Sequence, residues 1–386
     1  SKDYHSRLCN TLALKISGID GMARDPKGGR IERSADGTCN GVLFETATEI
    51  IDNFLQLPSP TVLKLAIREA IGEIYAYGLA GFHTMESRLS CELLQQAQSE
   101  GTLFRLCWHF PVEEVDSLAS QKLQSYQGDE FFKLGGMKIF GDGSLGSRTA
   151  AMAQPYSSEP ANTGILRYTD AELFDLSAHA AQFGFASTIH AIGDRCVNQV
   201  LRTLLKVQKR FPHQKLFHRI EHLQSIKPED IVLLAQSGIF CSLQPVHLAN
   251  DVPMIKTHWA DIETEVYVWK SLMARGINPG FGSDAPIESI NPMLGIYTAL
   301  TRRPAFDRHQ PAFHPEEALS LHQALAGYTL AAAMSSRSET HFGSLELGKT
   351  ADLMVLDDFQ NQDSEFWLQA RSLLTMIGGK IVHSTM

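Results

Sequence analysis

The stretch Gly136-Met137-Lys138-Ile139-Phe140-Gly141-Asp142-Gly143-Ser144-Leu145-Gly146-Ser147-Arg148 joins a short apolar run to a glycine-rich segment. An apolar run that ends in glycines is typical of a buried parallel strand that opens into a loop. Lys138 is unusual in such a strand. Burying an unpaired ammonium is costly, so the amine must pair with a carboxylate, lose its charge or be modified. Taken alone, the stretch leaves open a simple ion pair between Lys138 and Asp142.

Strand-like runs and helical patterns alternate on both sides of this stretch. Such repetition is typical of a parallel sheet. We therefore expect an α/β fold, a (β/α)₈ TIM-like barrel, although a closed barrel needs eight strands and we count seven. No convincing strand precedes residue 61, so we expect the first strand to be absent from this chain. The expected strands are residues 80–85, 103–109, 134–140, 185–190, 216–222, 238–243 and 277–283, and the expected helices are 91–100, 171–182, 196–210, 228–236, 265–275 and 292–301.

The two ends of the chain depart from this alternation. Residues 1–60 carry turn signals and one short helical pattern at 11–17, which indicates a long, irregular surface excursion. Further helices are predicted at 61–77 and 315–334. Near the end, 353–356 and 373–382 alternate and turn like a small antiparallel unit. We expect a barrel domain at 1–335, in which 1–60 is an insertion-like excursion, and a small β-domain at 336–386.

The bulk composition is that of a soluble globular enzyme. The chain has 386 residues, 44% hydrophobic and 20% charged, which is ample for a large core. A formal net charge of -9 argues against a nucleic-acid partner or binding to an anionic membrane. The six cysteines form no Cys-x-x-Cys pair, which disfavours a cysteine-based zinc site and indicates a reducing, cytoplasmic location, although an even count leaves disulfides open.

Four of the expected strands end in or near a potential metal ligand, namely Lys138, His190, His222 and Asp284. Each of these residues also has a purely structural interpretation: a core histidine, a strand cap, or an aspartate in a turn before proline. The carboxyl ends of barrel strands meet at one rim, however, and four coincidences at the same rim favour a metal site over structural roles. A lysine that has captured carbon dioxide is an anionic oxygen ligand, which would explain Lys138.

Other polar residues near strand ends are weaker candidates. Arg148, Gln244 and His247 follow strand ends and are predicted to contact a substrate, although polar loop residues are often only solvated. His83 and His109 also point toward the rim by position, and a structural role is the favoured interpretation for both.

These stretches resemble the amidohydrolase superfamily, in the branch that includes N-substituted formamide deformylase and the exoenzyme-regulatory-protein-like amidohydrolases. The resemblance covers nearly the whole chain, from an insertion that follows the family's first barrel strand to the last segment. The segments that carry it are 4–14, 137–150, 190–194, 219–222, 242–247, 282–286 and 343–353.

The resemblance implies a (β/α)₈ barrel beside a small β-sandwich formed from both chain ends. It also implies one or two metal ions, usually zinc, with other divalent transition metals possible, held by carboxylated Lys138, His190, His222 and Asp284. The expected reaction is hydrolysis of a C–N bond in a small amide, formamide or cyclic amide by activated water, with Asp284 as general base.

One departure from the family pattern is the lack of any His-x-His, which should end the first strand and hold a metal. An absent N-terminal segment would explain the missing strand and the missing ligands together. The alternative is a catalytically impaired barrel that acts as a binding or regulatory protein. A metal-free lyase or isomerase with Lys138 as a Schiff-base amine is a third possibility, but it gives the histidines no shared role. The sequence leaves a homo-oligomer open.

Overall fold

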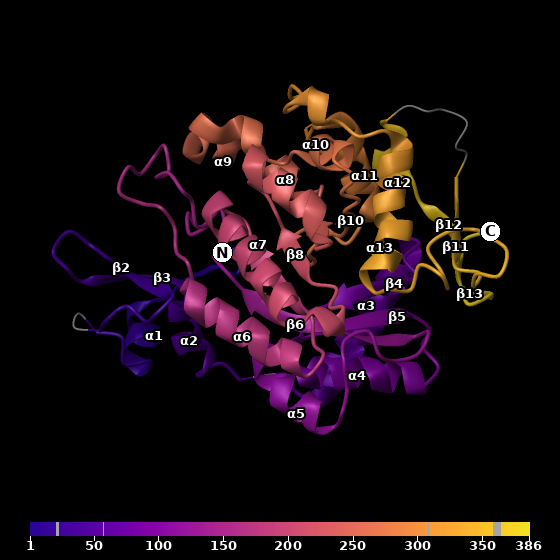
Figure 1. The fold of residues 1–386 in the computed structure, drawn as a ribbon, viewed down its shortest axis with the longest axis horizontal. Coiled ribbons are helices and arrows are strands. Elements are labelled where there is room, and N and C mark those ends of the chain that lie inside the picture. Colours follow the sequence, from indigo (N-terminus) through magenta and orange to yellow (C-terminus); the bar gives the residue numbers. More distant parts are fainter. Residues whose placement is uncertain (21–22, 57, 308, 358–363) are drawn as a thin grey trace.

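The computed structural model describes residues 1–386 except 21–22, 57, 308 and 358–363. Its centre is a seven-stranded parallel sheet whose strands follow one another in chain order (Figure 1). All seven expected strands are confirmed, with slightly different ends. They are β4 (Gly81–Thr84), β5 (Arg105–Pro111), β6 (Phe132–Phe140), β7 (Ser187–Ala191), β8 (Arg219–His222), β9 (Phe240–Leu243) and β10 (Gly280–Phe281).

The sheet is curled. In a flat sheet β4 and β8 would lie about 19 Å apart, since four strand spacings separate them. The Arg219 guanidinium of β8 nevertheless lies 2.9 Å from the His83 ring of β4. The strands therefore wrap around a shared interior, and the α/β TIM-like barrel architecture is confirmed in outline. Among the described residues, β4 and β10 end the sheet and do not pair with each other.

Helices follow the strands and cover the outside of the sheet (Figure 1). In α7, Val200 and Leu204 are fully buried against the sheet while Arg202 faces solvent, as an amphipathic helix requires. The helices of this layer are α3 (Pro60–Ala76), α4 (Arg88–Ser99), α5 (Val115–Ser120), α6 (Asp170–Gln182), α7 (Asp194–Arg210), α8 (Pro228–Ser237), α9 (His247–His258), α10 (Trp269–Ala274), α11 (Pro292–Thr301), α12 (Leu321–Tyr328) and α13 (Leu330–Ser335).

The single helix expected at 315–334 is wrong. A 3-10 turn, Pro315–Glu317, comes first, and α12 starts only after Ser320, which forms a capping box with Gln323. The chain breaks again at Thr329, whose φ of -119° and ψ of -89° are not helical. Two short helices therefore replace one long one.

The prediction that residues 1–60 are irregular is also wrong. They form a three-stranded antiparallel sheet in the order β1-β3-β2, with Leu43 and Ile31 in its own small core. Asp36-Gly37 is the turn between β2 and β3, where Gly37 has a φ of +85° that glycine adopts without strain. This N-terminal unit consists of β1 (Ser6–Leu8), α1 (Thr11–Ile16), β2 (Gly29–Arg33), β3 (Cys39–Glu45) and α2 (Glu49–Asp52).

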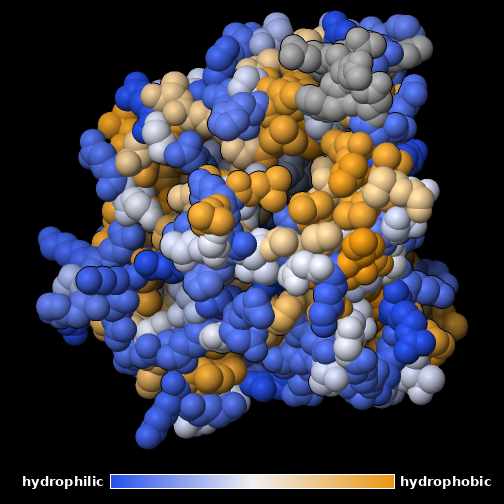
Figure 2. Space-filling model, turned by 90° about the vertical axis from the view of Figure 1, so that its right-hand side faces the viewer, coloured by the Kyte–Doolittle hydropathy of each residue, from blue (hydrophilic) through white to orange (hydrophobic). Residues whose placement is uncertain are grey.

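The C-terminal strands form a second small antiparallel sheet, as expected. β11 (Leu353–Leu356) pairs with β12 (Ser372–Ile377), which pairs with β13 (Lys380–Ser384) through the Gly378-Gly379 turn, and α14 (Phe366–Gln369) precedes β12. Figure 2 shows this side of the molecule, with apolar side chains gathered in its middle.

The C-terminal sheet is anchored at the amino-terminal end of the barrel strands. Arg105, the first residue of β5, is buried and forms an ion pair with Asp352, whose carboxylate also accepts a hydrogen bond of 2.8 Å from the Gly378 amide. Thr375 of β12 donates to the carbonyl of Tyr75 in α3 at 2.6 Å. This sheet is therefore fixed at the end opposite to the rim of strand carboxyl ends.

Two general expectations can be compared with the structure. All six cysteines are free, four of them buried. Among the described residues, no helix combines the length and the apolar character that a bilayer crossing demands.

Candidate active site

Three of the four predicted ligands lie close together at the carboxyl-terminal rim of the sheet. The rings of His190 and His222 have centroids 4.5 Å apart. His222, His247 and Asp284 each offer a ligand atom within 4.8 Å of the others. A metal ion could be held by this set, because two imidazoles and a carboxylate suit divalent transition metals. We call Lys138, His190, His222, His247 and Asp284 the rim cluster.

Lys138, the fourth predicted ligand, is buried near the end of β6. Its Nζ lies 4.5 Å from the centre of the Phe140 ring and forms no ion pair within the described part of the chain. Burial lowers the pKa of the Lys138 ammonium, and the carboxylates of Glu221 and Asp284 oppose this change. An amine of lowered pKa is more often neutral, the form that can react with carbon dioxide.

The alternative pairing of Lys138 with Asp142 is not formed among the described residues. Asp142 instead accepts hydrogen bonds of 2.8 to 3.1 Å from the backbone amides of Ala151, Ile192 and Gly193. Burial raises the pKa of the Asp142 carboxyl to about 7, although these hydrogen bonds oppose the rise. Asp142 thus ties the loop after β6 to the loop after β7.

Neighbouring groups occupy one ring nitrogen of each predicted histidine ligand. His190 Nε2 lies 3.0 Å from the carbonyl oxygen of Gly143, so this nitrogen carries the proton and donates. His222 Nδ1 lies 2.9 Å from Oε1 of Gln244 and donates likewise. His190 Nδ1 and His222 Nε2 have no hydrogen-bond partner among the described residues. Such second contacts fix the tautomer of a metal-binding histidine.

His247, predicted as a substrate contact, lies in α9 beside Asp284. Its Nδ1 accepts from Gln224 at 3.4 Å, and its Nε2 lies 3.7 Å from the Asp284 carboxylate. His247 Nε2 is buried without a hydrogen-bond partner among the described residues. Desolvation raises the pKa of Asp284, while His247 and then Lys138 oppose the rise. Because Nδ1 accepts, His247 Nε2 carries the proton and can donate to Asp284 or to a bound molecule.

The other two predicted substrate contacts occupy different surroundings. Gln244 adjoins the rim cluster through His222. Arg148 lies in the loop after β6, where its guanidinium forms an ion pair with Glu159 and its carbonyl accepts from Asn162 at 3.0 Å. A substrate contact by Arg148 stays a prediction.

A second group with metal-ligand side chains lies deeper in the curled sheet. His83, Cys107 and His109 bring their ligand atoms within 4.8 Å of one another, and Arg219 lies among them. The Arg219 guanidinium is 2.9 Å from His83 Nδ1 and 3.3 Å from His109 Nε2. A cation would have to displace this fixed positive charge. We call these four residues the inner cluster.

Both ring nitrogens of each histidine in the inner cluster have a polar neighbour within hydrogen-bond distance. His109 Nδ1 accepts from the Gly136 amide at 3.1 Å, and its Nε2 lies 2.9 Å from His83 Nδ1. His83 Nε2 lies 3.0 Å from the Ser335 hydroxyl. Burial, followed by the charge of Arg219, lowers the pKa of each of these histidines well below its usual value. These contacts support the structural role favoured for His83 and His109.

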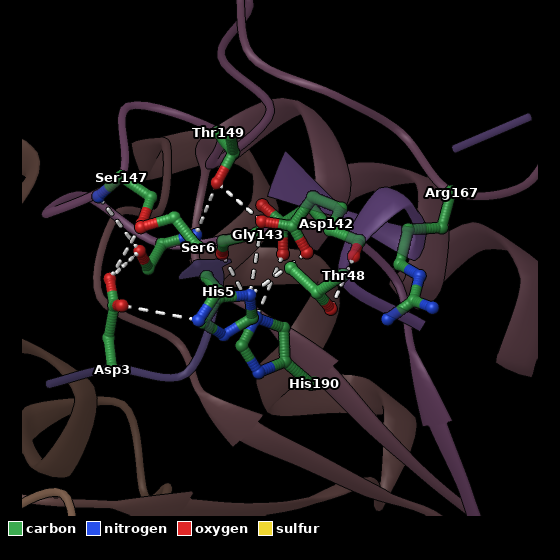
Figure 3. Close-up of polar contacts among 12 residues, drawn as sticks. Asp3, His5, Ser6, Thr48, Asp142, Gly143, Ser147, Thr149, Arg167 and His190 are labelled. Carbon is green, nitrogen blue, oxygen red and sulfur yellow. Dashed lines mark hydrogen bonds and ion pairs between the residues drawn. The ribbon is translucent and has the colours of Figure 1, made fainter. Parts of the chain in front are cut away.

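Sequence reasoning missed His5, which the N-terminal unit brings to the rim (Figure 3). The rings of His5 and His190 have centroids 5.0 Å apart, and His5 Nδ1 lies 2.9 Å from the Glu45 carboxylate. This contact depends on how residues 1–8 pack against the loop after β6. No local pattern in the sequence signals it.

Comparisons with known proteins show which proteins this chain resembles. A family model described as "Amidohydrolase family" matches residues 1–383. The amidohydrolase YtcJ of Bacillus subtilis is 30% identical over 98% of this chain and 72% of its own length. N-substituted formamide deformylase of Arthrobacter pascens is 26% identical over 92% of this chain and 67% of its own length.

A solved metal-dependent hydrolase of Pyrococcus horikoshii superposes with a TM-score of 0.74 at 24% identity, covering 94% of this chain and 70% of that one. This structural likeness shows a shared fold. The family resemblance stated from the sequence is confirmed by the family model, and so is the class of enzyme, a hydrolase acting on carbon–nitrogen bonds.

Proposed function

The chain belongs to the amidohydrolase family, and on this basis we propose that it hydrolyses a C–N bond of a small amide, formamide or cyclic amide with the aid of zinc. The observation that carries the proposal is the meeting of His222, His247 and Asp284 within 4.8 Å, with His190 against His222. Free ring nitrogens and a carboxylate directed to one place are suited to a divalent transition metal.

We assign the ligands as Lys138 in its carboxylated form, His190, His222 and Asp284, around one or two ions. A bound zinc ion would make water more acidic and polarise the carbonyl that is attacked. Gly143 and Gln244 hold the two histidines in the tautomers that leave a nitrogen free, which supports this assignment.

Asp284 is the general base of the proposed reaction. Its carboxylate takes the proton from the attacking water and then delivers it to the departing nitrogen. His247, 3.7 Å away, is placed to keep the carboxylate oriented.

The substrate class is inferred from the relatives' names. N-substituted formamide deformylase acts, by its name, on substituted formamides, and 30% identity over 150 residues links this chain to an imidazolonepropionase of Acinetobacter baumannii. We therefore favour a small formamide or a cyclic amide as substrate. Oligomeric state and a cytoplasmic location stay predictions.

Two finer features of the fold belong to the proposal. An eighth strand carrying His-x-His would fit between the unpaired edges of β4 and β10 and close the barrel. The C-terminal sheet keeps Val355 and Ile381 exposed, which fits one layer of a β-sandwich. The second candidate function is a binding or regulatory barrel without catalysis.

The test measures bound zinc by elemental analysis and hydrolysis of N-formyl amines by the purified full-length protein. We expect the wild type to bind zinc and to be active. Lys138→Ala should lose metal, and Asp284→Asn should lower kcat by about 10²- to 10⁴-fold.

The control is Gln208→Leu, a glutamine in α7 whose side-chain amide donates to the Ser237 carbonyl at 3.1 Å, and it should match the wild type. Retained hydrolysis in Asp284→Asn would exclude its role as the base. A wild type that binds no transition metal and cleaves none of the amides would favour the binding protein.

A further inference from the structure

We propose that His5 contacts the substrate, so that the N-terminal unit supplies a functional residue to the rim of the barrel. The inference rests on the proposed hydrolysis at the rim cluster. It is carried by the position of His5, by the support of its ring from Glu45, and by the freedom of its second ring nitrogen.

The N-terminal unit is joined to the glycine-rich loop after β6 by hydrogen bonds between their side chains (Figure 3). Asp3 accepts hydrogen bonds from the hydroxyls of Ser144, at 2.5 Å, and Ser147, at 3.0 Å. Thr149 of the same loop donates to Glu45 at 2.6 Å. His5 lies between Asp3 and Glu45, which make these hydrogen bonds, so its backbone position is fixed relative to the loop that leads out of β6.

The ring of His5 is held in one orientation by Glu45. Its Nδ1 lies 2.9 and 3.1 Å from the two carboxylate oxygens, and the side chain of Glu45 is almost fully buried. Glu45 has a φ of +51°, which costs energy in a residue other than glycine. Gly143 leaves room for the carboxylate, since a Cβ there would lie 2.1 Å from Glu45 Oε1. This strained residue, buried and closely packed, serves to hold His5.

The His5 ring lies beside residues at the rim of the barrel. The ring lies 5.0 Å from His190 and 6.4 Å from Phe140, between centroids. Since Nδ1 is engaged by Glu45, only Nε2 remains, and this atom has no hydrogen-bond partner among the described residues. The side chain keeps 12% of its surface exposed. An imidazole fixed by a carboxylate with its other nitrogen free can make a directed hydrogen bond to the amide group that is cleaved.

Two other roles would predict different behaviour. If His5 served only to pack against His190, an aromatic ring without nitrogens would replace it. If it held a metal ion, its loss would lower the metal content. Neither group of metal-ligand side chains that meet within 4.8 Å includes His5.

The experiment compares His5→Phe and His5→Gln with the wild-type full-length protein, using the N-formyl amines that the wild type cleaves. His179→Phe is the matched control, because His179 also pairs with a carboxylate, that of Asp116 at 2.7 Å, but lies exposed in α6. Each protein is assayed for kcat and KM, bound zinc and thermal unfolding midpoint.

We expect His5→Phe to bind zinc as the wild type does and to lose about 10- to 100-fold in kcat/KM, the size of one hydrogen bond in a reacting complex. His5→Gln, which retains a hydrogen-bonding side chain, should recover part of this loss, and His179→Phe should equal the wild type. If His5→Phe fails to fold, the comparison of His5→Gln with His179→Phe decides, with a loss expected only in the first.

Unchanged kcat/KM in a folded His5→Phe protein, or in His5→Gln where His5→Phe does not fold, would overturn the inference while leaving the proposed hydrolysis intact. Loss of zinc together with activity would overturn it in favour of a metal-holding role. A wild type without activity toward any amide would instead contradict the proposed function itself.

Discussion

The rim cluster and the inner cluster are built from similar side chains but differ in what remains free. In the inner cluster, both nitrogens of His83 and of His109 have close polar neighbours, and Arg219 occupies the place where a cation would sit. In the rim cluster, one nitrogen of His190 and one of His222 lack a partner among the described residues. Residue type alone therefore does not define a metal site, because the neighbours decide which atoms are available.

Arg219 is the residue that most distinguishes the inner cluster from the rim cluster. Its guanidinium forms an ion pair with Glu221, and both side chains are at least 94% buried. Arg219→Met would leave the Glu221 carboxylate buried without its partner, and we expect the free energy of unfolding to fall by about 3 to 5 kcal/mol. Denaturant titration measures this.

The control for Arg219→Met is Lys27→Met, which removes the exposed pair with Glu172 and should cost less than about 1 kcal/mol. Equal effects of the two substitutions would show that Arg219 does not compensate a buried charge.

His218 lies outside both clusters and is expected to make the folded protein less stable in acid. His218 is fully buried, accepts from the Ser187 amide at 3.0 Å, and has its pKa lowered by burial from 6.5 to about 4. The unfolded chain binds a proton near pH 6.5 and the folded chain only near pH 4, so stability falls as the pH drops through this window. The contribution of His218 is up to about 3 kcal/mol, since one pKa unit corresponds to about 1.4 kcal/mol.

His218→Asn offers an oxygen to the Ser187 amide but cannot titrate. Unfolding free energies measured from pH 7 to pH 4 should therefore fall less steeply for His218→Asn than for the wild type. Parallel curves for the two proteins would contradict the assigned effect of burial.

In the rim cluster, Gln244 is expected to keep Nε2 of His222 free for a metal ion. Gln244→Leu removes the acceptor for His222 Nδ1, so the ring is no longer held in the tautomer that frees Nε2. We expect zinc affinity to fall by about 10- to 100-fold, as for other second contacts of metal-binding histidines. Competition with a chelator measures it, and an unchanged affinity would show that Gln244 does not support metal binding through His222.

The sequence predicted the barrel well because its signals are local. Each strand of the parallel sheet is a short apolar run between turn residues, and the ligand candidates Lys138 and His222 lie near strand ends, so one topological rule brings them together. The same rule could not show which nitrogens are free. A structural role was favoured for His83 and His109, and the contact that supports it, with the guanidinium of Arg219, joins β8 to β4.

The failures have a common physical origin in long-range packing. The N-terminal sheet consists of strands such as Gly29–Arg33, whose polar residues hide its core pattern, although Asp36-Gly37 was a usable turn signal. The contact between His5 and His190 spans 185 positions and depends on Asp3 meeting the loop after β6. The break at Thr329 follows Gly327 and Tyr328, which are weak helix formers, but the alanine-rich run after it masked this signal.

The ion pair between Arg105 and Asp352 has a practical consequence. It fixes the C-terminal sheet at the amino-terminal end of the barrel strands, away from the rim where His190 and Asp284 lie. The Gly378-Gly379 turn leads into β13, which begins with the exposed Lys380 on this far side. Coupling the protein to a solid support or a fluorescent reporter through this turn would leave the mouth of the barrel facing the solution.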